Sequence, residues 1–169
     1  PQLDYTYIPT GKVAGGRFRF DINSVSLSRS IGPDSQRLTT ELNWRLPLVF
    51  GGGQLWTLIA DARGDVFHVD NNDPVDFPGV PDKSRYVSRG IPYVALDWRW
   101  PFITHSKSGN SSFILEPLAQ FIAQPYGGNP SGLPIEDADA FEFDDNNLFS
   151  VNQLPGYDLV ESGPRANVG

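Results

Sequence analysis

The sequence RLTTELNWRLPLVF, residues 37–50, alternates apolar and polar side chains. One parity holds Leu38, Leu42, Trp44, Leu46 and Leu48, and the other holds Arg37, Thr39, Glu41, Asn43 and Arg45. Successive side chains of a β-strand point to opposite faces, so this period of two predicts a strand whose faces meet different surroundings. The run exceeds the roughly five or six residues usual for a soluble strand. By itself it fits either a strand tilted through a bilayer, with lipid on one side and a watery lumen on the other, or a long strand of a soluble sheet.

The same alternation predicts six further strands along the chain. They are expected at residues 2–9, 17–29, 54–69, 89–102, 112–124 and 160–169. The segments between them are rich in glycine, proline, asparagine and aspartate, which favour turns. The 17 glycines and 15 prolines also favour many strands joined by turns over helices. We therefore predict an all-β, antiparallel, up-and-down fold with about seven strands.

The apolar parity changes within residues 17–29. Phe18, Phe20 and Ile22 share one parity, whereas Val25 and Leu27 continue on the other. One extra residue in a strand moves every later side chain to the opposite face of the sheet. The sequence therefore predicts a β-bulge in this strand.

The connections between the predicted strands alternate in length. Residues 10–16, 51–53 and 104–111 are short turns, whereas residues 30–36, 70–88 and 125–159 are modest to very long loops. Alternate turns of an antiparallel sheet lie at opposite ends, so the short turns share one end. Outer-membrane β-barrels show this asymmetry, with short periplasmic turns and long extracellular loops. An interfacial girdle is expected near the short turns, formed by Phe18, Phe50, Trp56, Trp98, Trp100, Phe102 and Phe113.

The polar parities of the predicted strands carry charges of both signs. In a barrel these side chains would face the lumen, where opposite charges on neighbouring strands can pair. They indicate either a water-filled interior with compensated charges or a polar conduit for an amphiphile whose acyl chains stay in lipid. The lumen-facing candidates are Arg17, Arg19, Asp21, Arg37, Glu41, Arg45, Asp61, Arg63, Asp65, Asp97, Arg99, Glu116, Glu161 and Arg165.

Composition excludes several classes of protein. The net charge of −7 argues against a nucleic-acid partner. Zero cysteine excludes disulfides and cysteine metal sites, and no window of about twenty apolar residues predicts a transmembrane helix. The first residue is proline and methionine is absent, so we expect a fragment of a longer protein. A solvated loop cluster is expected at Glu136, Asp137, Asp139, Glu142, Asp144 and Asp145.

No motif in the sequence makes a convincing catalytic, cofactor or metal site. His68 and His105 are the only histidines, and neither has a metal-ligand partner at short spacing. Residues 70–73 and 144–147 offer oxygen ligands suited to calcium, but without EF-hand spacing, and solvated turns are the simpler interpretation. The glycine runs lack the lysine and helix of a phosphate loop. We therefore predict a protein that is not an enzyme, with no cofactor and no metal.

The later part of the chain resembles a known family. FEFDDNNLFS (residues 141–150) and PGYDLVESGPRANVG (155–169) are similar to the C-terminal barrel of LptD, the LPS-assembly outer-membrane or organic solvent tolerance protein family, in its alphaproteobacterial form. LDWRWPF (96–102), LEPLAQ (115–120), LPIEDA (133–138) and, more weakly, PQLDYTY (1–7) extend the resemblance over the whole chain. The residues of the loop motif are Phe141, Phe143, Asp144, Asp145, Asn147, Leu148, Phe149, Gly156, Tyr157 and Asp158.

The resemblance implies that residues 1–169 are part of a C-terminal transmembrane β-barrel domain, without its N-terminal jelly roll or gate strands. It implies lipopolysaccharide transport and assembly at the outer leaflet of the bacterial outer membrane. The implied partners are lipopolysaccharide, an LptE-type plug lipoprotein, periplasmic LPS-transport bridge proteins acting through the jelly roll, and outer-membrane lipid. Leu159 stands where the family usually has arginine, which leaves any anion contact of that arginine open.

Two other functions remain open from the sequence. A general outer-membrane porin or channel would show the same strand pattern. A soluble β-sandwich binding module could bury the aromatic parity in its core and expose the charged parity to water. As a segment, the chain cannot close a barrel and has two unpaired edges, so we expect it to aggregate in water.

Overall fold

The computed structural model describes residues 1–30, 33–70, 84–106, 111–131, 133, 135–137, 148–154 and 156–169. None of these residues lies in a helix, and so none belongs to a helix able to cross a membrane. The strands are β1 (Gln2–Tyr7), β2 (Arg17–Leu27), β3 (Asp34–Phe50), β4 (Gln54–Asp70), β5 (Arg85–Arg99), β6 (Phe102–His105), β7 (Ser112–Leu115), β8 (Leu118–Ala123) and β9 (Arg165–Val168). The predicted all-β fold is confirmed.

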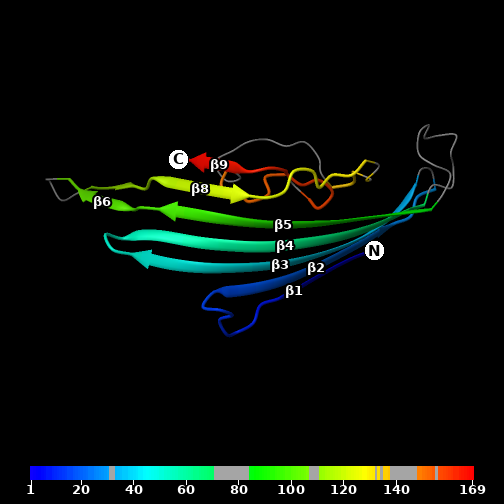
Figure 1. Ribbon diagram of the computed structural model, residues 1–169, viewed down its shortest axis with the longest axis horizontal. Helices are drawn as coiled ribbons and strands as arrows, with labels where there is room; N and C mark the ends of the chain where they lie inside the picture. Colours follow the sequence, from blue (N-terminus) through cyan, green and yellow to red (C-terminus); the bar gives the residue numbers. More distant parts are fainter. Residues whose placement is uncertain are drawn as a thin grey trace.

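Seven strands form one antiparallel sheet in the order β1-β2-β3-β4-β5-β8-β9. Figure 1 shows this sheet as a single curved layer with β1 at one edge and β9 at the other, so the sheet is open in this chain. The predicted up-and-down arrangement is confirmed. The strands of the described residues include no second sheet packed face to face on this one, which a β-sandwich requires.

The stretch at residues 37–50 belongs to the longest hairpin of the sheet. β3 and β4 pair without interruption from Asp34 opposite Asp70 to Phe50 opposite Gln54. In the connecting turn Gly52 and Gly53 have φ of +79° and +82°, a conformation that glycine adopts without the penalty of a Cβ. This hairpin lies at the centre of the sheet, with β2 on one side and β5 on the other.

The two faces of β3 have the reverse of the burial expected in a soluble sheet. Leu38 and Leu42 are 45 % and 44 % exposed, whereas Arg37 and Thr39 on the other parity are 8 % and 1 % exposed. Soluble sheets bury their apolar parity and expose their charged one. The covered face is therefore the polar, concave one. The convex face is apolar and largely exposed, except that the turn at residues 13–16 contacts Trp44 and Leu46.

The predicted β-bulge in the second strand is wrong. β2 pairs with β3 residue for residue, from Arg17 opposite Arg45 to Leu27 opposite Ser35. With the register unbroken, Val25 and Leu27 lie on the concave face, where they line a small pocket together with Phe67. The change of parity in the sequence thus marks a local apolar patch on the covered face, with no extra residue in the strand.

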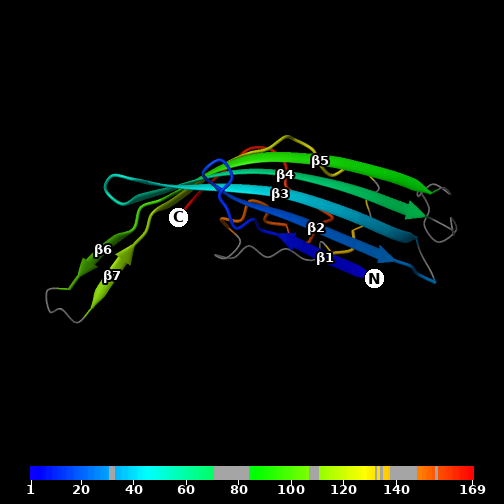
Figure 2. The same ribbon diagram turned by 90° about the horizontal axis from the view of Figure 1, so that it is seen from below.

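Two predicted strands are each broken by a proline. Residues 89–102 and 112–124 were predicted as continuous, but β5 ends before Pro101 and β8 begins after Pro117. Proline has no N–H for the ladder, and beyond this point β6 and β7 pair only with each other among the described strands. Figure 2 shows this hairpin leaving the sheet at an angle, beyond the end that carries the short turns.

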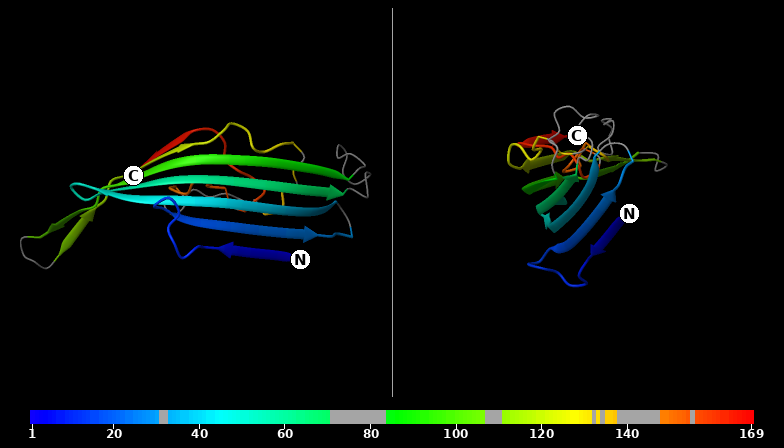
Figure 3. Two further views of the ribbon diagram at one scale, coloured as in Figure 1. Left: turned by 60° about the horizontal axis from the view of Figure 1, so that its bottom comes forward. Right: turned by 90° about the vertical axis from the view of Figure 1, so that its right-hand side faces the viewer.

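The longest connection lies across the concave face. We call its described part the strap: residues 124–131, 133, 135–137, 148–154 and 156–164. Figures 1 and 3 show it lying on one side of the sheet. The last predicted strand, residues 160–169, is regular only from Arg165, because Gly163 has a φ of +85° and Pro164 follows it. The residues before Gly163 belong to the strap.

Candidate functional site

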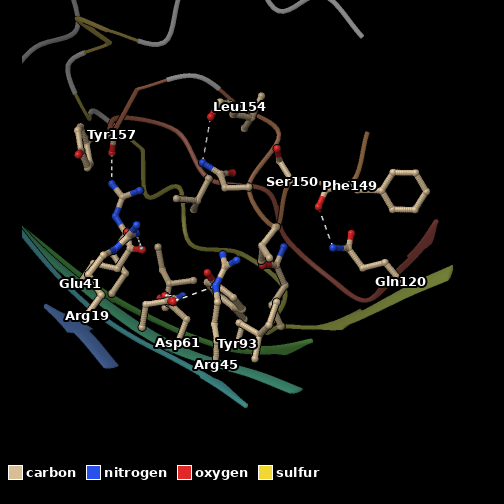
Figure 4. A pocket seen from close by; sticks show the side chains of 18 of the residues that line it. Arg19, Glu41, Arg45, Asp61, Tyr93, Gln120, Phe149, Ser150, Leu154 and Tyr157 are labelled. Carbon is tan, nitrogen blue, oxygen red and sulfur yellow. Dashed lines mark hydrogen bonds and ion pairs between the residues drawn. The ribbon is translucent and has the colours of Figure 1, made fainter. Parts of the chain in front are cut away.

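The strap and the concave face line a half-open cavity of about 600 Å³. Figure 4 shows side chains from the strands and from the strap pointing into it. Phe149, Leu154 and Tyr157 line it from the strap. Its strand lining includes Arg19, Glu41, Arg45, Asp61, Tyr93 and Gln120.

Some of the charges around this cavity are compensated by a neighbour on the same or the adjacent strand. Arg19 Nε lies 2.6 Å from Asp21 Oδ2, and its Nη2 lies 3.6 Å from Glu41 Oε1. Asn43 Nδ2 donates to Asp61 Oδ2 over 2.8 Å. These contacts favour a wetted interior with paired charges, because an isolated charge would be costly to remove from water.

Three arginines from three neighbouring strands hold the strap at the loop end of the sheet. Arg37 comes from β3, Arg63 from β4 and Arg89 from β5, and all three converge on Tyr157 and Asp158 of the strap. We call these three arginines the arginine clamp. A guanidinium carries several N–H donors in a fixed plane, so it can bind a carboxylate and backbone carbonyls at the same time.

Asp158 is the buried anion of this contact. Its side chain is 1 % exposed, and Oδ1 accepts from Arg37 Nη1. Oδ2 accepts from the backbone N–H groups of Glu136 and Asp137, the latter over 2.8 Å. A buried carboxylate needs such partners, because desolvation without them would cost several kcal/mol. Asp158 therefore ties two parts of the strap to β3 at one point.

Tyr157 contributes both its backbone and its ring. Its carbonyl oxygen accepts from Arg63 Nη2, and from Arg89 Nη2 over 2.6 Å. The ring centroid lies 5.1 Å from Arg37 Cζ and 5.3 Å from Arg63 Cζ, within cation–π distance. The ring thus lies against two guanidinium groups whose charge is also neutralised by carboxylates.

Asp65 supplies the counter-charge on the sheet side. Its Oδ1 lies 3.1 Å from Arg63 Nε, and its Oδ2 lies 2.6 Å from Arg89 Nε. Arg89 also donates from Nη1 to the carbonyl oxygens of Gly128 and Asp158, over 3.1 and 2.8 Å. One arginine therefore binds two segments of the strap that are distant in sequence, which fixes the fold of the strap as well as its position.

Asp137 closes the anchor from within the strap. Its Oδ1 accepts from the backbone N–H groups of Tyr157 and Asp158 over 2.9 and 3.0 Å, and its Oδ2 lies 2.8 Å from Arg37 Nη1. Burial acts to raise the pKa of Asp137. The hydrogen bond from the Tyr157 backbone, together with Asp158 and Arg37, outweighs burial and holds this pKa below its usual value.

Gly156 allows this close approach. Its φ is +73°, and a Cβ at this position would meet the carboxylate of Asp137 and, 2.6 Å away, the carbonyl oxygen of Asp137. Any side chain would therefore be strained and would also displace Asp137. The geometry therefore requires glycine at position 156.

A second anchor lies further along the sheet, on β8 and β9. Gln120 Nε2 donates over 2.8 Å both to Asp97 Oδ1 and to the carbonyl oxygen of Phe149. Asn167 Nδ2 donates to Gln120 Oε1 over 2.8 Å and to the carbonyl oxygen of Leu148 over 2.9 Å. These side-chain amides donate to backbone carbonyls of the strap and so tie it to β8 and β9.

Most of the lumen-facing candidates from the sequence lie on the concave face. Arg17, Arg19, Asp21, Arg37, Glu41, Arg45, Asp61, Arg63, Asp65, Asp97, Arg99 and Arg165 occupy strand positions of this parity. Glu116 and Glu161 do not lie on strands. Glu116 lies between β7 and β8, 3.8 Å from Arg99, and Glu161 lies in the strap and binds Arg165.

The sequence reasoning missed Arg89, Gln120 and Asn167 as anchoring residues. A signal for Arg89 was present, because counting back in steps of two from Asp97 places it on the charged parity of β5. Gln120 and Asn167 are uncharged, so a search for charges on the polar parity passes over them.

The loop motif divides between the strap and residues that are not described. Leu148, Phe149, Gly156, Tyr157 and Asp158 belong to the strap and take part in its two anchors. Phe141, Phe143, Asp144, Asp145 and Asn147 lie outside the described residues. In the strap, the backbone carbonyls of Leu148 and Phe149 are what the sheet recognises.

The acidic cluster is in part a structural contact. Glu136 accepts from Ser35 Oγ over 3.2 Å and is paired with Arg29, and Asp137 is paired with Arg37. The expectation of a purely solvated cluster is therefore wrong for these two acids. Asp139, Glu142, Asp144 and Asp145 lie outside the described residues.

Neither histidine lies in a metal cluster within the described part of the chain. His68 stacks on Tyr86, with ring centroids 4.4 Å apart, and lies 2.6 Å from Ser84 Oγ. Among the described residues no group of three or more histidine, aspartate or glutamate side chains is arranged to hold a metal. Of the two acidic oxygen-rich segments, only Asp70 is described.

A long-stranded antiparallel sheet with an apolar exposed face and a charged covered face defines the wall of an outer-membrane β-barrel type of protein. Comparison with known families identifies which one. The model of the LptD family, described as LPS transport system D, matches residues 1–169. The chain belongs to the LptD family, a family of lipopolysaccharide transport and assembly at the outer membrane. A search of curated proteins finds no significant match.

Proposed function

We propose that this chain forms part of the wall of a closed barrel that passes lipopolysaccharide to the outer leaflet of the outer membrane. The observation that carries the proposal is the inverted burial of the sheet. Leu38, Leu42 and Val94 on the convex face are 45, 44 and 52 % exposed, and the opposite face is charged and covered. In a bilayer the apolar face would contact lipid acyl chains, and the charged face would border a watery lumen.

The proposed orientation places the short turns in the periplasm and the long loops outside. β3 and β4 have 17 residues each, whereas about ten tilted residues suffice to cross a bilayer. The central hairpin therefore extends beyond the hydrocarbon layer. Arg37 and Arg89 lie near the loop ends of β3 and β5, and Arg63 lies near the middle of β4. The strap would therefore be tied down between the middle and the outer end of the lumen.

The twelve charged candidates on the concave face become proposed lumen-lining residues, and Glu161 reaches the lumen through the strap. Arg45 and Asp61 border the cavity beneath the strap. Because many of these charges are already paired, we propose that they provide a polar path for sugar and phosphate groups without a strong binding site for either. The acyl chains would stay on the lipid side of the wall.

The remaining parts of the transport system would come from outside this segment. We propose residues 1–169 as part of a C-terminal transmembrane barrel domain, with the unpaired edges of β1 and β9 continued by neighbouring strands. An LptE-type plug lipoprotein and periplasmic LPS-transport bridge proteins, the latter acting through an N-terminal domain, are the proposed protein partners. The proposed role is transport without enzymatic activity, in a multi-pass barrel of the bacterial outer membrane.

Site-specific photo-cross-linking in cells tests the proposal. A photo-reactive amino acid at Arg45, on the concave face, should form an adduct with lipopolysaccharide that disappears when its periplasmic supply is stopped. The matched position is Leu48 on the same strand, on the convex face and close to the glycine turn, where the neighbours should be phospholipids. Equal lipopolysaccharide adducts at both positions, whether or not supply continues, would refute the proposal.

A general porin is the competing function. The strap covers the concave face at two anchors, so the complete protein should conduct ions poorly in planar bilayers. Depletion in cells should reduce surface lipopolysaccharide. Steady high conductance combined with normal surface lipopolysaccharide after depletion would favour a porin.

A further inference from the structure

The β6–β7 hairpin has no partner among the described strands. Its four residue pairs run from Phe102 opposite Leu115 to His105 opposite Ser112. The two links that join it to β5 and β8 are held together by a backbone hydrogen bond, from Trp100 N–H to the carbonyl oxygen of Pro117 over 3.1 Å. Figures 2 and 3 show it bending away from the direction of the long strands. A lone two-stranded hairpin is marginally stable in water, so its surroundings matter.

The stem of the hairpin exposes large apolar side chains. Residues opposite each other in an antiparallel pair share a face, so Phe102, Leu115 and Phe113 lie on one face with Thr104. Their exposed fractions are 42, 71 and 64 %. We call this the belt face.

The opposite face carries two isoleucines and two polar residues. Ile103 and Ile114 pair with each other, and His105 pairs with Ser112 at the far end of the hairpin. The belt face is thus the more apolar of the two, and the polar side chains of the other face lie away from the sheet. The hairpin therefore carries apolar side chains next to the sheet and a polar pair at its far end.

The belt face continues a row of aromatic rings on the convex face of the sheet. Ring centroids are separated by 6.3 Å from Phe50 to Trp56, 6.2 Å from Trp56 to Trp98, 6.2 Å from Trp98 to Trp100 and 4.6 Å from Trp100 to Phe102. Tryptophan and other aromatic residues concentrate where a membrane protein crosses from hydrocarbon to head groups. The row therefore connects the lipid-facing surface of the sheet to the hairpin without a break.

The backbone of the hairpin restricts its depth in a membrane. Among the described strands, nothing pairs with the outer edges of β6 and β7, and unpaired strand edges are not found exposed to hydrocarbon. At the level of the head groups, water and polar lipid atoms can satisfy them. The hairpin is therefore suited to the boundary between head groups and acyl chains.

We propose that the β6–β7 hairpin docks on the lipid surface of the leaflet at the short-turn end, with its belt face towards the acyl chains. This inference rests on the proposed function in one respect, because it takes the convex face of the sheet as lipid-facing. The hairpin then acts as an interfacial anchor that sets the depth and tilt of this part of the barrel in the membrane.

Residues 1–169 contain no cysteine, so single-cysteine labelling can test the proposal directly once any cysteine elsewhere in the complete protein has been replaced by serine. The complete protein would be folded into liposomes of phosphatidylethanolamine and phosphatidylglycerol and labelled with an environment-sensitive fluorophore at Leu115, at Ser112 or at Val94. Lipids carrying a quencher in the head group, at a shallow acyl position or at a deep acyl position would report the depth. Circular dichroism would verify the fold of each labelled variant.

We expect the Leu115 label to shift to shorter emission wavelength and to be quenched most by the shallow quencher. The Ser112 label should emit as in water, and the Val94 label, at mid-sheet, should be quenched most by the deep quencher. A Leu115 label that emits as in water, while Val94 remains in lipid, would overturn the hairpin proposal and leave the proposed function intact. A Val94 label in water would instead contradict the lipid-facing sheet.

Two further outcomes would indicate that protein, not lipid, covers the belt face. A Leu115 label that is blue-shifted but is quenched by none of the lipids would indicate a covering protein. Self-quenching between labels on different copies would indicate a hairpin-to-hairpin contact. Either result would overturn the lipid proposal. The double variant Phe102→Ser and Phe113→Ser gives a second check. It should reduce the blue shift of the label at Leu115 without altering the quenching profile of the label at Val94.

Discussion

The two ends of this sheet differ in the side chains that they bury and expose. At the loop end, charges are buried, and the arginine clamp fixes the strap through Asp158 and the Tyr157 carbonyl. At the short-turn end, apolar side chains of the β6–β7 hairpin such as Ile114 and Leu115 are 67 % and 71 % exposed. Buried charges need specific partners at fixed distances, whereas exposed apolar surface needs only an apolar neighbour. The loop end is therefore suited to one specific contact within the protein, and the short-turn end to a less specific contact with lipid.

Removing the anion of the clamp should have the largest effect. In Asp158→Ala, Arg37 loses its closest buried partner, and the backbone N–H groups of Glu136 and Asp137 lose their acceptor. Breaking a buried ion pair on one side costs about 3–5 kcal/mol. The strap should leave the sheet and become sensitive to limited proteolysis in the folded barrel. Asp158→Asn keeps the shape and should show an intermediate effect. Equal protease resistance in all three proteins would mean that the clamp does not hold the strap.

The steric fit of Gly156 should matter next. Gly156→Ala combines a φ of +73° with a clash against Asp137, and strain of this kind costs roughly 1–3 kcal/mol. Gly127→Ala is the matched control, because Gly127 has a φ of +92° and a Cβ there would meet nothing within 4 Å. The difference in urea unfolding midpoint between the two variants isolates the contact with Asp137. Similar midpoints would mean that backbone strain alone, without the clash against Asp137, destabilises Gly156→Ala.

Acidification should loosen the strap only in strongly acid solution. The pKa of Asp137 is held below its ordinary value of 3.8, so its contribution to strap docking is present above this pH. That contribution disappears as the pH falls through the lower pKa of the docked state. A fluorophore on the strap should report release only below about pH 3.8, and Asp137→Asn should weaken this pH dependence. Release near neutral pH would assign the contact to another group.

The hairpin should tolerate polar substitution with the smallest loss of stability. Leu115→Ser changes a side chain that is 71 % exposed, and substitutions at such surface sites usually stay within about 0.5 kcal/mol. The unfolding midpoint in micelles should therefore hardly move. A shift as large as that of Gly156→Ala would show that the hairpin packs against protein and would end the contrast between the two ends of the sheet.

The alternation at residues 37–50 was sufficient to predict the sheet, because a strand between two different media repeats its environment every second residue. The up-and-down order followed from the alternation of short turns and long loops. The break at Pro101 and Pro117 was visible in the sequence as well, since proline removes a donor from the ladder. It was missed because the apolar pattern runs on through Phe102 and Phe113.

The strap could not be predicted by the same reasoning. Its residues have no period, and its contacts join positions as distant as Arg37 and Asp158. Val25 and Leu27 show the related limit: a change of parity can mean an inserted residue or a patch that contacts something non-local, and only the register distinguishes these. The resemblance located Gly156, Tyr157 and Asp158 as a motif, but their role as an anchor depends on the strands beneath them.

The central hairpin also has a consequence for the order of folding. β3 and β4 are joined by three glycines and pair along their whole length, so little chain entropy is lost in bringing them together. The clamp instead joins residues 121 positions apart, and its three arginines are aligned only after β3, β4 and β5 have paired. Contacts of such long range form slowly. The wall of the barrel must therefore assemble before the strap can bind, and until then the concave face stays open.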